Sequence, residues 1–249
     1  SSSSVCENDS TDFINSSSIP DDTIISWNWD FNNGEAQSTD TNPSYLFSSP
    51  GNYDVALTVT SNNGCIDSVT KLVIVNSLPT ANAGNDTFIC IGKSTPLQAS
   101  GGVSYSWFTD ATLSDTSISN PLATPSSQNS YFVIVKDVNS CADTDTVVVF
   151  VNPLPPAEAG LAPQVCLGDS TMLFASGGII YSWNAENTLS DTSVSNPVVV
   201  PADTTEYFVS VTDINGCVNF DSVTIIVNPY FPVADFSATT VCNNDSTFF

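Results

Sequence analysis

The sequence predicts an all-β protein made of tandem antiparallel β-sandwich domains that follow one another in a linear array. Three observations support this prediction. Apolar and polar residues alternate within short runs, no stretch of the 249 residues has helical spacing, and cysteines and tryptophans recur at a fixed interval. About seven short strands fit into each repeat of roughly 75 residues, with one tryptophan on a middle strand, as in a two-sheet sandwich.

The individual strands are predicted from alternation and from turn residues. Val103, Tyr105 and Trp107 alternate with polar residues, which indicates a strand with one buried face. The turns SNNG (61–64) and DING (213–216) each precede a second alternating run. Because Asn-Gly favours tight hairpin turns, these segments predict that the last two strands of a repeat form a hairpin.

Two series of cysteines divide the chain into domains. The second series recurs every 76 residues, and the first does so after an initial interval of 84. The first series is Cys6, Cys90, Cys166 and Cys242, and the second is Cys65, Cys141 and Cys217. The predicted domains are 1–77, 78–153, 154–229 and an incomplete fourth, 230–249. Short proline-rich linkers between them predict semi-rigid connections.

The incomplete fourth domain repeats the start of the first. VCNNDSTFF (241–249) resembles VCENDSTDF (5–13) after an interval of 236 residues. The three complete domains therefore form one larger repeat, and the sequence after it begins a second. This predicts a segment of a longer chain.

The charge of the chain excludes several functions. Three lysines oppose 26 carboxylates, and the chain has neither arginine nor histidine, so the net charge is −23. Such a surface repels phosphate backbones, which predicts that nucleic acid is not a partner. No apolar run reaches 18 residues, so this segment is not expected to span a membrane. Any signal peptide is expected to lie outside this segment.

The motifs resemble a known family. WNWDFNNG (27–34) and NPSYLFSSPGNYDVALTVT (42–60) resemble the PKD domain pattern, with Asn32 and Asn33 in place of its usual Gly-Asp. The motif ASGGVSYSW (99–107) and its later copy are similar to PKD-like or Ig-like repeats of giant cell-surface proteins of the Bacteroidota, of the gliding-motality or adhesin type. The resemblance implies Ig-like sandwiches throughout the chain.

The resemblance implies a mechanical function. The expected function is a non-catalytic stalk or filament segment of a large secreted adhesin, which presents a distal adhesive or motility-linked tip. Export by the phylum-specific secretion system would place it at the cell surface. Expected partners are neighbouring repeats, laterally associated chains in a filament, and surface glycans. Two alternatives remain: a polysaccharide-binding module, and spacer domains of an extracellular hydrolase.

The cysteines allow two disulfide pairings. A first-series cysteine and a second-series cysteine of one sandwich are expected at opposite ends, roughly 20 Å apart at about 3.3 Å per residue, whereas bonded Cα atoms lie within about 7 Å. This geometry favours bonds between consecutive domains, but bonds within domains stay open. The pairings between domains are Cys6–Cys141 and Cys90–Cys217. The pairings within domains are Cys6–Cys65, Cys90–Cys141 and Cys166–Cys217.

Catalytic chemistry is not predicted. Without histidine, hydrolytic triads and HExxH-type zinc sites are excluded. The carboxylate pairs Asp21/Asp22 and Asp143/Asp145 are of the type used in glycoside hydrolysis, but both fall in predicted loops without an aromatic cleft. We expect them to be solvated turn residues, and we expect the chain not to be an enzyme.

Calcium is the one cofactor that the sequence suggests. Asp30, Asn32, Asn33 and Glu35 carry oxygen ligands in the loop that binds calcium in some PKD relatives. The spacing is not specific to calcium, and ordinary hydrogen-bonded Asx turns are the alternative. The two expectations are therefore a calcium site in this loop or no cofactor.

The resemblance also implies O-glycosylation. Bacteroidota glycosylate Ser or Thr that follows Asp and precedes Ala, an aliphatic residue or Thr. The candidate acceptors are Ser10, Thr23, Ser68, Thr146, Ser170, Thr204, Ser222 and Ser246. Because Asp, Ser and Thr are common in turns, chance occurrence is the alternative.

Two sets of recurring apolar residues have competing interpretations. The repeated tryptophans are expected in the cores rather than on sugar-binding faces, and they are Trp29, Trp107 and Trp183. The second set lies on the outward phase of each last strand and comprises Ile74, Phe150 and Ile226. Either the first strand covers this second set, or it forms a lateral contact stripe.

Overall fold

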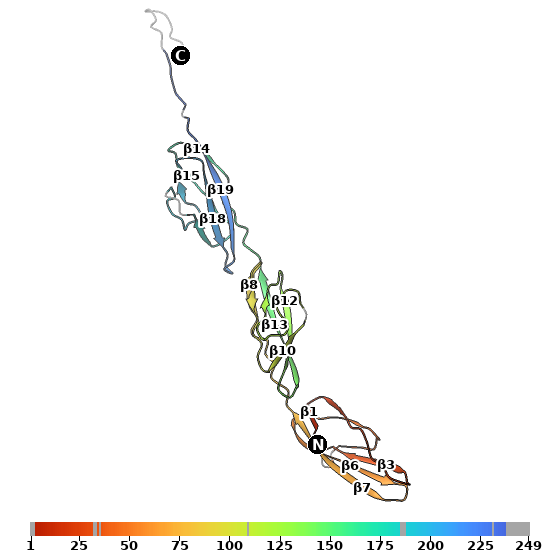
Figure 1. Cartoon of the computed structure of the whole chain (residues 1–249). Coiled ribbons are helices and arrows are strands. Elements are labelled where there is room, and N and C mark those ends of the chain that lie inside the picture. Colours follow the sequence, from red (N-terminus) through yellow and green to blue (C-terminus); the bar gives the residue numbers. More distant parts are fainter. Residues whose placement is uncertain are drawn as a thin grey trace, which may run out of the picture. The chain divides into compact units, whose positions relative to one another are not determined.

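The computed structural model describes residues 3–31, 34, 36–108, 110–184, 188–230 and 232–237, and all helices and strands within these ranges are β-strands (Figure 1). The all-β prediction is therefore confirmed. The chain divides into two compact units, Ser1–Val151 and Asn152–Phe249. Separate hydrophobic clusters lie within residues 5–75, 81–151 and 157–225, and we describe the chain by these three domains.

The first domain forms a five-stranded sheet with the order β1-β7-β6-β3-β4 and a small pair, β2 with β5. Its strands are β1 (Ser3–Cys6), β2 (Ser10–Asp12), β3 (Ile24–Asp30), β4 (Gln37–Ser38), β5 (Ser44–Leu46), β6 (Gly51–Ser61) and β7 (Ile66–Asn76). Strands β6 and β7 form the predicted hairpin, and Gly64 in its turn has a positive φ of 80°. Glycine adopts this conformation without steric cost, which explains its place in the turn.

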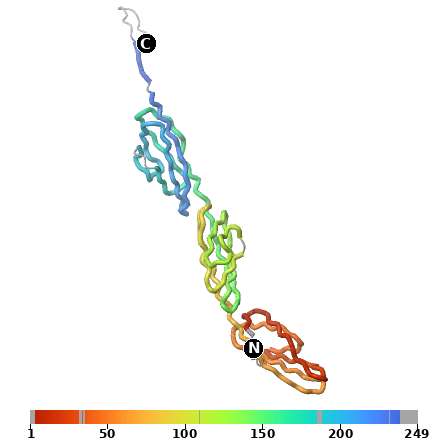
Figure 2. The backbone as a smooth tube through the Cα atoms, viewed as in Figure 1, coloured from red at the N-terminus to blue at the C-terminus, as the bar shows by residue number. Residues whose placement is uncertain are grey.

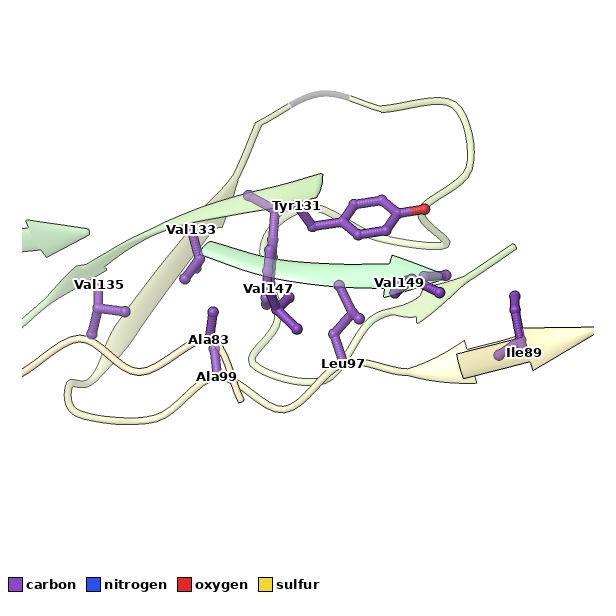
Figure 3. Packing of buried hydrophobic residues seen from close by; sticks show 11 residues of the cluster. Ala83, Ile89, Leu97, Ala99, Tyr131, Val133, Val135, Val147 and Val149 are labelled. Carbon is purple, nitrogen blue, oxygen red and sulfur yellow. The ribbon is translucent and has the colours of Figure 1, made fainter. Parts of the chain in front are cut away.

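The second domain has the sheet order β10-β12-β13-β8 and a short pair, β9 with β11. Its strands are β8 (Thr87–Cys90), β9 (Thr95–Pro96), β10 (Ser104–Trp107), β11 (Leu122–Ala123), β12 (Asn129–Lys136) and β13 (Ala142–Asn152). Figure 3 shows its core, where Val133 of β12 and Val147 of β13 point toward the loop that carries Ala83.

The third domain repeats this arrangement with the sheet order β14-β19-β18-β16 and the pair β15 with β17. Its strands are β14 (Gln164–Cys166), β15 (Thr171–Met172), β16 (Ile180–Trp183), β17 (Val198–Val199), β18 (Thr205–Thr212) and β19 (Val218–Asn228). Figure 2 traces how the chain folds back on itself within each domain.

The first strand of a domain differs from the antiparallel prediction. Strand β1 pairs in parallel with β7, with Cys6 opposite Asn76, and β14 pairs in parallel with β19 in the same way. Parallel neighbours need a long connection rather than a tight turn, and here most of a domain separates the two strands. Cys6 therefore lies beside the end of β7, whereas Cys65 precedes its start. Eleven residues of β7 separate these two places, which is roughly 35 Å of strand.

The repeated tryptophans lie in the cores, as predicted. Trp29, Trp107 and Trp183 are 6%, 2% and 3% exposed. Each indole N–H donates a hydrogen bond to a backbone carbonyl 11 residues along the chain, at 2.9 to 3.1 Å. The hydrogen bond satisfies the one polar atom of each ring, so the ring can be buried at little cost.

The outward residues of the last strands are partly covered. Phe150 stacks on Phe88 of β8 with 4.8 Å between ring centroids, so here the first strand supplies cover. Ile226 stays 44% exposed although β14 lies beside β19. The first strand thus covers only part of this set, and a lateral contact stripe stays a prediction.

Asp110 makes the second domain sensitive to acid. The Thr112 hydroxyl and backbone N–H and the Asn129 amide donate to its carboxylate at 2.6 to 2.8 Å, which lowers the pKa of Asp110. A carboxyl whose pKa is lowered by folding stabilises the fold above its unfolded pKa of about 4 and loses this contribution as the pH falls. We expect Asp110→Asn to destabilise the protein at pH 7 and progressively less between about pH 4 and 2. Urea unfolding across this range measures the difference.

The matched control for Asp110 is Asp54→Asn, at an exposed position of β6. This variant should leave the pH dependence of the free energy of unfolding as it is in the unmodified chain. An Asp110→Asn effect that is equally large at all pH values would contradict the proposed electrostatic cause.

Candidate functional site: a disulfide joint and an open groove

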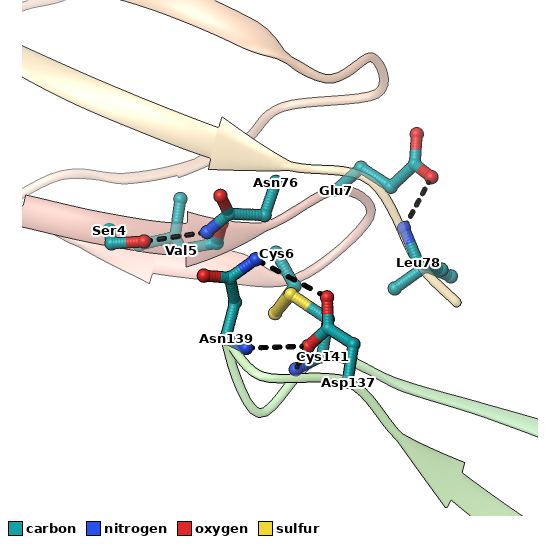
Figure 4. Close-up of a disulfide and its surroundings, with 9 residues drawn as sticks. All are labelled: Ser4, Val5, Cys6, Glu7, Asn76, Leu78, Asp137, Asn139 and Cys141. Carbon is teal, nitrogen blue, oxygen red and sulfur yellow. Dashed lines mark hydrogen bonds between the residues drawn. A yellow bond between two sulfur atoms is a disulfide. The ribbon is translucent and has the colours of Figure 1, made fainter. Parts of the chain in front are cut away.

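Cys6 lies where β1 ends beside the end of β7. The Asn76 side-chain amide donates to the Ser4 hydroxyl at 2.6 Å and to the Val5 carbonyl at 3.2 Å. Just beyond the strand, the Leu78 N–H donates to the Glu7 carboxylate at 2.9 Å (Figure 4). These contacts tie the exit of the first domain to the strand that carries Cys6.

Cys141 lies in the turn between β12 and β13, and Asp137 shapes this turn. The Asp137 carboxylate oxygen Oδ1 accepts hydrogen bonds from the backbone N–H groups of Asn139 and Cys141, both at 2.9 Å. Ser140 has a positive φ of 69°, which its sequence equivalent Gly216 adopts without strain. The Asp-x-Asn-x-Cys pattern is therefore an Asx turn that orients the cysteine.

A disulfide bond connects Cys6 to Cys141, with 5.5 Å between the Cα atoms and 135 residues between the cysteines in sequence (Figure 4). Cys141 is 1% exposed. Of the two pairings that the sequence left open, this is the one between consecutive domains. Because a cysteine forms one disulfide, it is incompatible with Cys6–Cys65 and with Cys90–Cys141. The length of β7 explains why Cys6 and Cys65 lie too far apart.

The other cysteines occupy repeats of the same two positions. The Asp213 carboxylate accepts from the Asn215 and Cys217 N–H groups at 2.9 and 2.8 Å, which is the Asp137 turn again. Cys65 is an exposed free thiol, and Cys166 is a half-buried one at the end of β14. The pairing Cys90–Cys217 stays a prediction, and Cys242 lies outside the described residues.

The carboxylates considered for catalysis bind backbone groups. Asp143 and Asp145 accept from the N–H groups of Ala81 and Ala83 at 3.0 and 2.8 Å. Asp22 accepts from the N–H of Thr23 and the side-chain amide of Asn63, and these interactions contribute to a lowered pKa of Asp22. Each of these three acids thus has a structural role. Asp21, at the neighbouring position, has a positive φ of 59°.

The segment bound by Asp143 and Asp145 covers the core. Asn82 within it pairs with Ser100 on the other side, through hydrogen bonds of 3.1 and 2.8 Å. We call residues 80–84 the cover segment of the second domain. The third domain has the same feature: Glu158 pairs with Ser176, and the Ala159 N–H donates to Asp221 at 2.7 Å.

The first domain is open at the equivalent place. Two adjoining grooves of about 280 and 290 Å³ lie between its sheet and residues 13–19, and they share Ser17, Leu57 and Val69. Val69 is 48% exposed, and the exposed Lys71 borders one groove. Sequence reasoning missed this site. Counting from the first-series cysteines would have found it, because Ser16, Ser100 and Ser176 each lie ten residues after one.

The calcium prediction concerns residues that are largely outside the described ranges. Asn32, Asn33 and Glu35 lie outside them, and Asp30 accepts a hydrogen bond from the Gly34 N–H at 2.8 Å. Within the described parts of the chain, no three His, Cys, Asp or Glu side chains are grouped as a metal site. Calcium binding stays a prediction.

The candidate glycosylation positions are mostly open to solvent. Ser222 is half-buried and donates to the Glu206 carboxylate at 2.7 Å, and Ser246 lies outside the described residues. The exposed acceptors are Ser10, Thr23, Ser68, Thr146, Ser170 and Thr204. Exposure permits modification without unfolding, and glycosylation itself stays a prediction.

Comparison with known proteins supports part of the resemblance. Residues 1–75 match the PKD domain family. Part of the chain is 40% identical over 82 residues to the pre-pro-metalloprotease PrtV of Vibrio cholerae, covering 32% of this chain and 8% of that protein. It is 38% identical over 71 residues to the microbial collagenase of Vibrio alginolyticus, covering 28% of this chain and 8% of that protein. The chain therefore spans a small part of these curated relatives.

Solved structures of low similarity cover more of the chain. Domains 3–5 of the extracellular part of Drosophila OTK match 91% of this chain and 94% of their own, with 10% identity and a TM-score of 0.34. SGBP-B from the mixed-linkage glucan utilization locus of Bacteroides ovatus matches 90% of this chain and 65% of its own, with 16% identity and a TM-score of 0.26. Among the described residues, none belongs to a helix able to cross a membrane.

Proposed function

We propose that this chain is a structural stalk or filament segment of a large secreted cell-surface protein, and that disulfides between consecutive domains stiffen it. The observation that carries the proposal is the Cys6–Cys141 bond. It connects the first domain to the second in addition to the linker NSLP (76–79). Two covalent connections between two bodies restrict the bending and twisting that a single linker permits.

The chemistry of the joint supports a load-bearing role. Cys141 is buried and its turn is held by the Asp137 carboxylate, so reductants in solution have little access to the bond. Stable disulfides also require an oxidising compartment, which supports a secreted or cell-surface location. The adhesive tip, the gliding-motility link, surface glycans as partners and the Bacteroidota secretion route are part of this proposal, and they derive from the sequence resemblance.

The same logic extends to the third domain. Because Cys141 is bonded to Cys6, it is not available to Cys90, and Cys217 lies in a turn that repeats the turn of Cys141. We therefore include a Cys90–Cys217 bond in the proposal. Peptide mapping under non-reducing conditions should yield a linked pair of peptides that contain these two cysteines. A linked Cys166–Cys217 pair would contradict it.

A second candidate function is a spacer in an extracellular hydrolase. The similarity to the two Vibrio proteases favours it, because in both the matched part is a small fraction of a protease. The domain content of the whole protein separates the two candidates. A catalytic domain in the same polypeptide would support the spacer, and many copies of the 236-residue repeat would support the stalk.

The stiffness of the joint can be tested by single-molecule fluorescence transfer. Fluorophores attached through unnatural amino acids at the exposed positions 68 and 130 report the separation of the first two domains. We expect a narrow distribution for the oxidised chain and a broad one for the variant Cys6→Ser/Cys141→Ser. The control Cys65→Ser removes a free thiol and should leave the distribution narrow. Equal widths in all three proteins would contradict the stalk proposal.

A further inference from the structure

The open groove of the first domain lies where the other two domains hold a cover segment. In the second domain Asn82 pairs with Ser100, and in the third Glu158 pairs with Ser176. Ser16 is the equivalent of these serines and lines the groove. The groove wall therefore presents the backbone to which a cover segment binds elsewhere in this chain.

The opposite wall of the groove is also equivalent. In the second domain, β13 contributes Asp145 and Val147 to this place, and Val147 is 1% exposed. Strand β7 contributes Val69 and Lys71, counted in the same way from its cysteine, and both are accessible. Partly exposed apolar residues at a position that is otherwise covered indicate a surface that binds another segment.

One described segment of the chain has the matching position in the repeat but no domain to cover. Val233 lies nine residues before Cys242, just as Ala81 lies nine residues before Cys90. Val233 and Phe236 are 91% and 88% exposed, and residues 232–237 form no strand. The domain that would follow this segment repeats the first domain, because VCNNDSTFF resumes VCENDSTDF.

We propose that the groove of the first domain binds Pro232–Ser237 of a second copy of this chain. The bound segment would exchange backbone hydrogen bonds with Ser16, as Asn82 does with Ser100, in the manner of an added strand. Its Val, Ala and Phe side chains supply apolar surface for Leu57 and Val69, and Asp235 supplies a carboxylate for Lys71. In the chain of charge −23, Lys71 is one of three cations, so this charge match is selective.

The free cysteines give the proposal a second, independent consequence. Cys6, at the end of a first strand, bonds Cys141 in the last hairpin turn of the following domain. Cys166 at the end of β14 and Cys65 in the last turn of the first domain have the same two positions, and both are free thiols. Binding of the segment makes the second copy's first domain the one that follows, so it brings Cys166 of one copy toward Cys65 of the other.

The proposal can be tested with two complementary variants of the full chain. Val69→Glu places a charge in the groove, and Phe236→Ser removes the largest apolar side chain of the segment. We expect each variant alone to have the mass of a single chain in light scattering. An equimolar mixture should have the mass of two, because one intact groove meets one intact segment. A mixture with the mass of one chain would overturn the proposal.

The matched control is Leu72→Glu, which adds the same charge to the same strand at a residue 39% exposed that does not line either groove. It should behave as the unmodified chain. A synthetic peptide with the sequence of residues 232–239 provides a direct measurement. It should bind the Phe236→Ser chain saturably, with a dissociation constant below about 1 mM, and the Val69→Glu chain at least about tenfold more weakly. Equal binding to both would overturn the proposal.

Oxidation of the mixed dimer tests the head-to-tail arrangement. Two thiols and one molecule of oxidised glutathione exchange to give one protein disulfide and two molecules of reduced glutathione. Peptide mapping should then show Cys65 of one variant linked to Cys166 of the other. Dimers linked only between identical cysteines would contradict the arrangement, and would do so even if the disulfide joint of the stalk is correct.

Discussion

Replacing both Cys6 and Cys141 by serine is expected to lower the free energy of unfolding by about 4 to 5 kcal/mol. The bond closes a loop of 135 residues, and a cross-link over so long a loop removes much of the conformational entropy of the unfolded chain. Urea unfolding, followed by the fluorescence of the buried tryptophans, measures the change. The loss should appear in the first two domains, which the bond connects.

Two comparisons make this prediction specific to the bond. Cys65→Ser removes a cysteine that is not bonded, and it should change the free energy of unfolding by less than about 0.5 kcal/mol. Reducing agent should destabilise the unmodified chain much as the double variant is destabilised. A double variant as stable as the unmodified chain would mean that the bond contributes nothing to stability in solution.

Replacing Gly101 by alanine is expected to destabilise the second domain by about 2 to 5 kcal/mol. Gly101 has a positive φ of 103°, and a Cβ atom placed there would overlap the backbone carbonyl of Thr80 in the cover segment. The side chain therefore adds a steric clash to the cost of the backbone conformation. Thermal unfolding should detect the loss, together with increased exposure of the core beneath the cover segment.

Gly92→Ala is the matched control for this variant. Gly92 also has a positive φ, 79°, but no atom lies within 4 Å of a Cβ atom placed there. It should lose only the conformational part, about 1 to 2 kcal/mol. Equal losses at Gly92 and Gly101 would contradict close packing of the cover segment against the Ser-Gly-Gly turn.

The strands and the buried residues could be predicted from local sequence. Alternation places Trp107 and Val133 on inward positions, and inward positions of a sandwich are covered by the second sheet. The parallel pairing of β1 with β7 could not be predicted in this way. Alternation has the same period in parallel and antiparallel strands, and the partner of β1 lies a whole domain away in sequence.

The sites show the same division. The spacing of the cysteines reduced their pairing to two alternatives, but only the three-dimensional distance between Cys6 and Cys141 selects one. The groove was not predicted at all. Its lining combines Ser16 from a loop with Val69 from β7, and nothing local to either segment indicates that the place between them is open.

The sequence by itself determined the fold class, the repeat and the kinds of chemistry that are excluded, because alternation, turn residues and composition are local or additive properties. The tertiary structure decided which cysteine meets which, and where a domain lacks a covering segment. Both depend on segments more than 50 residues apart in sequence, as with Ser16 and Val69. Their approach follows from the strand order of a whole domain, so no local pattern encodes it.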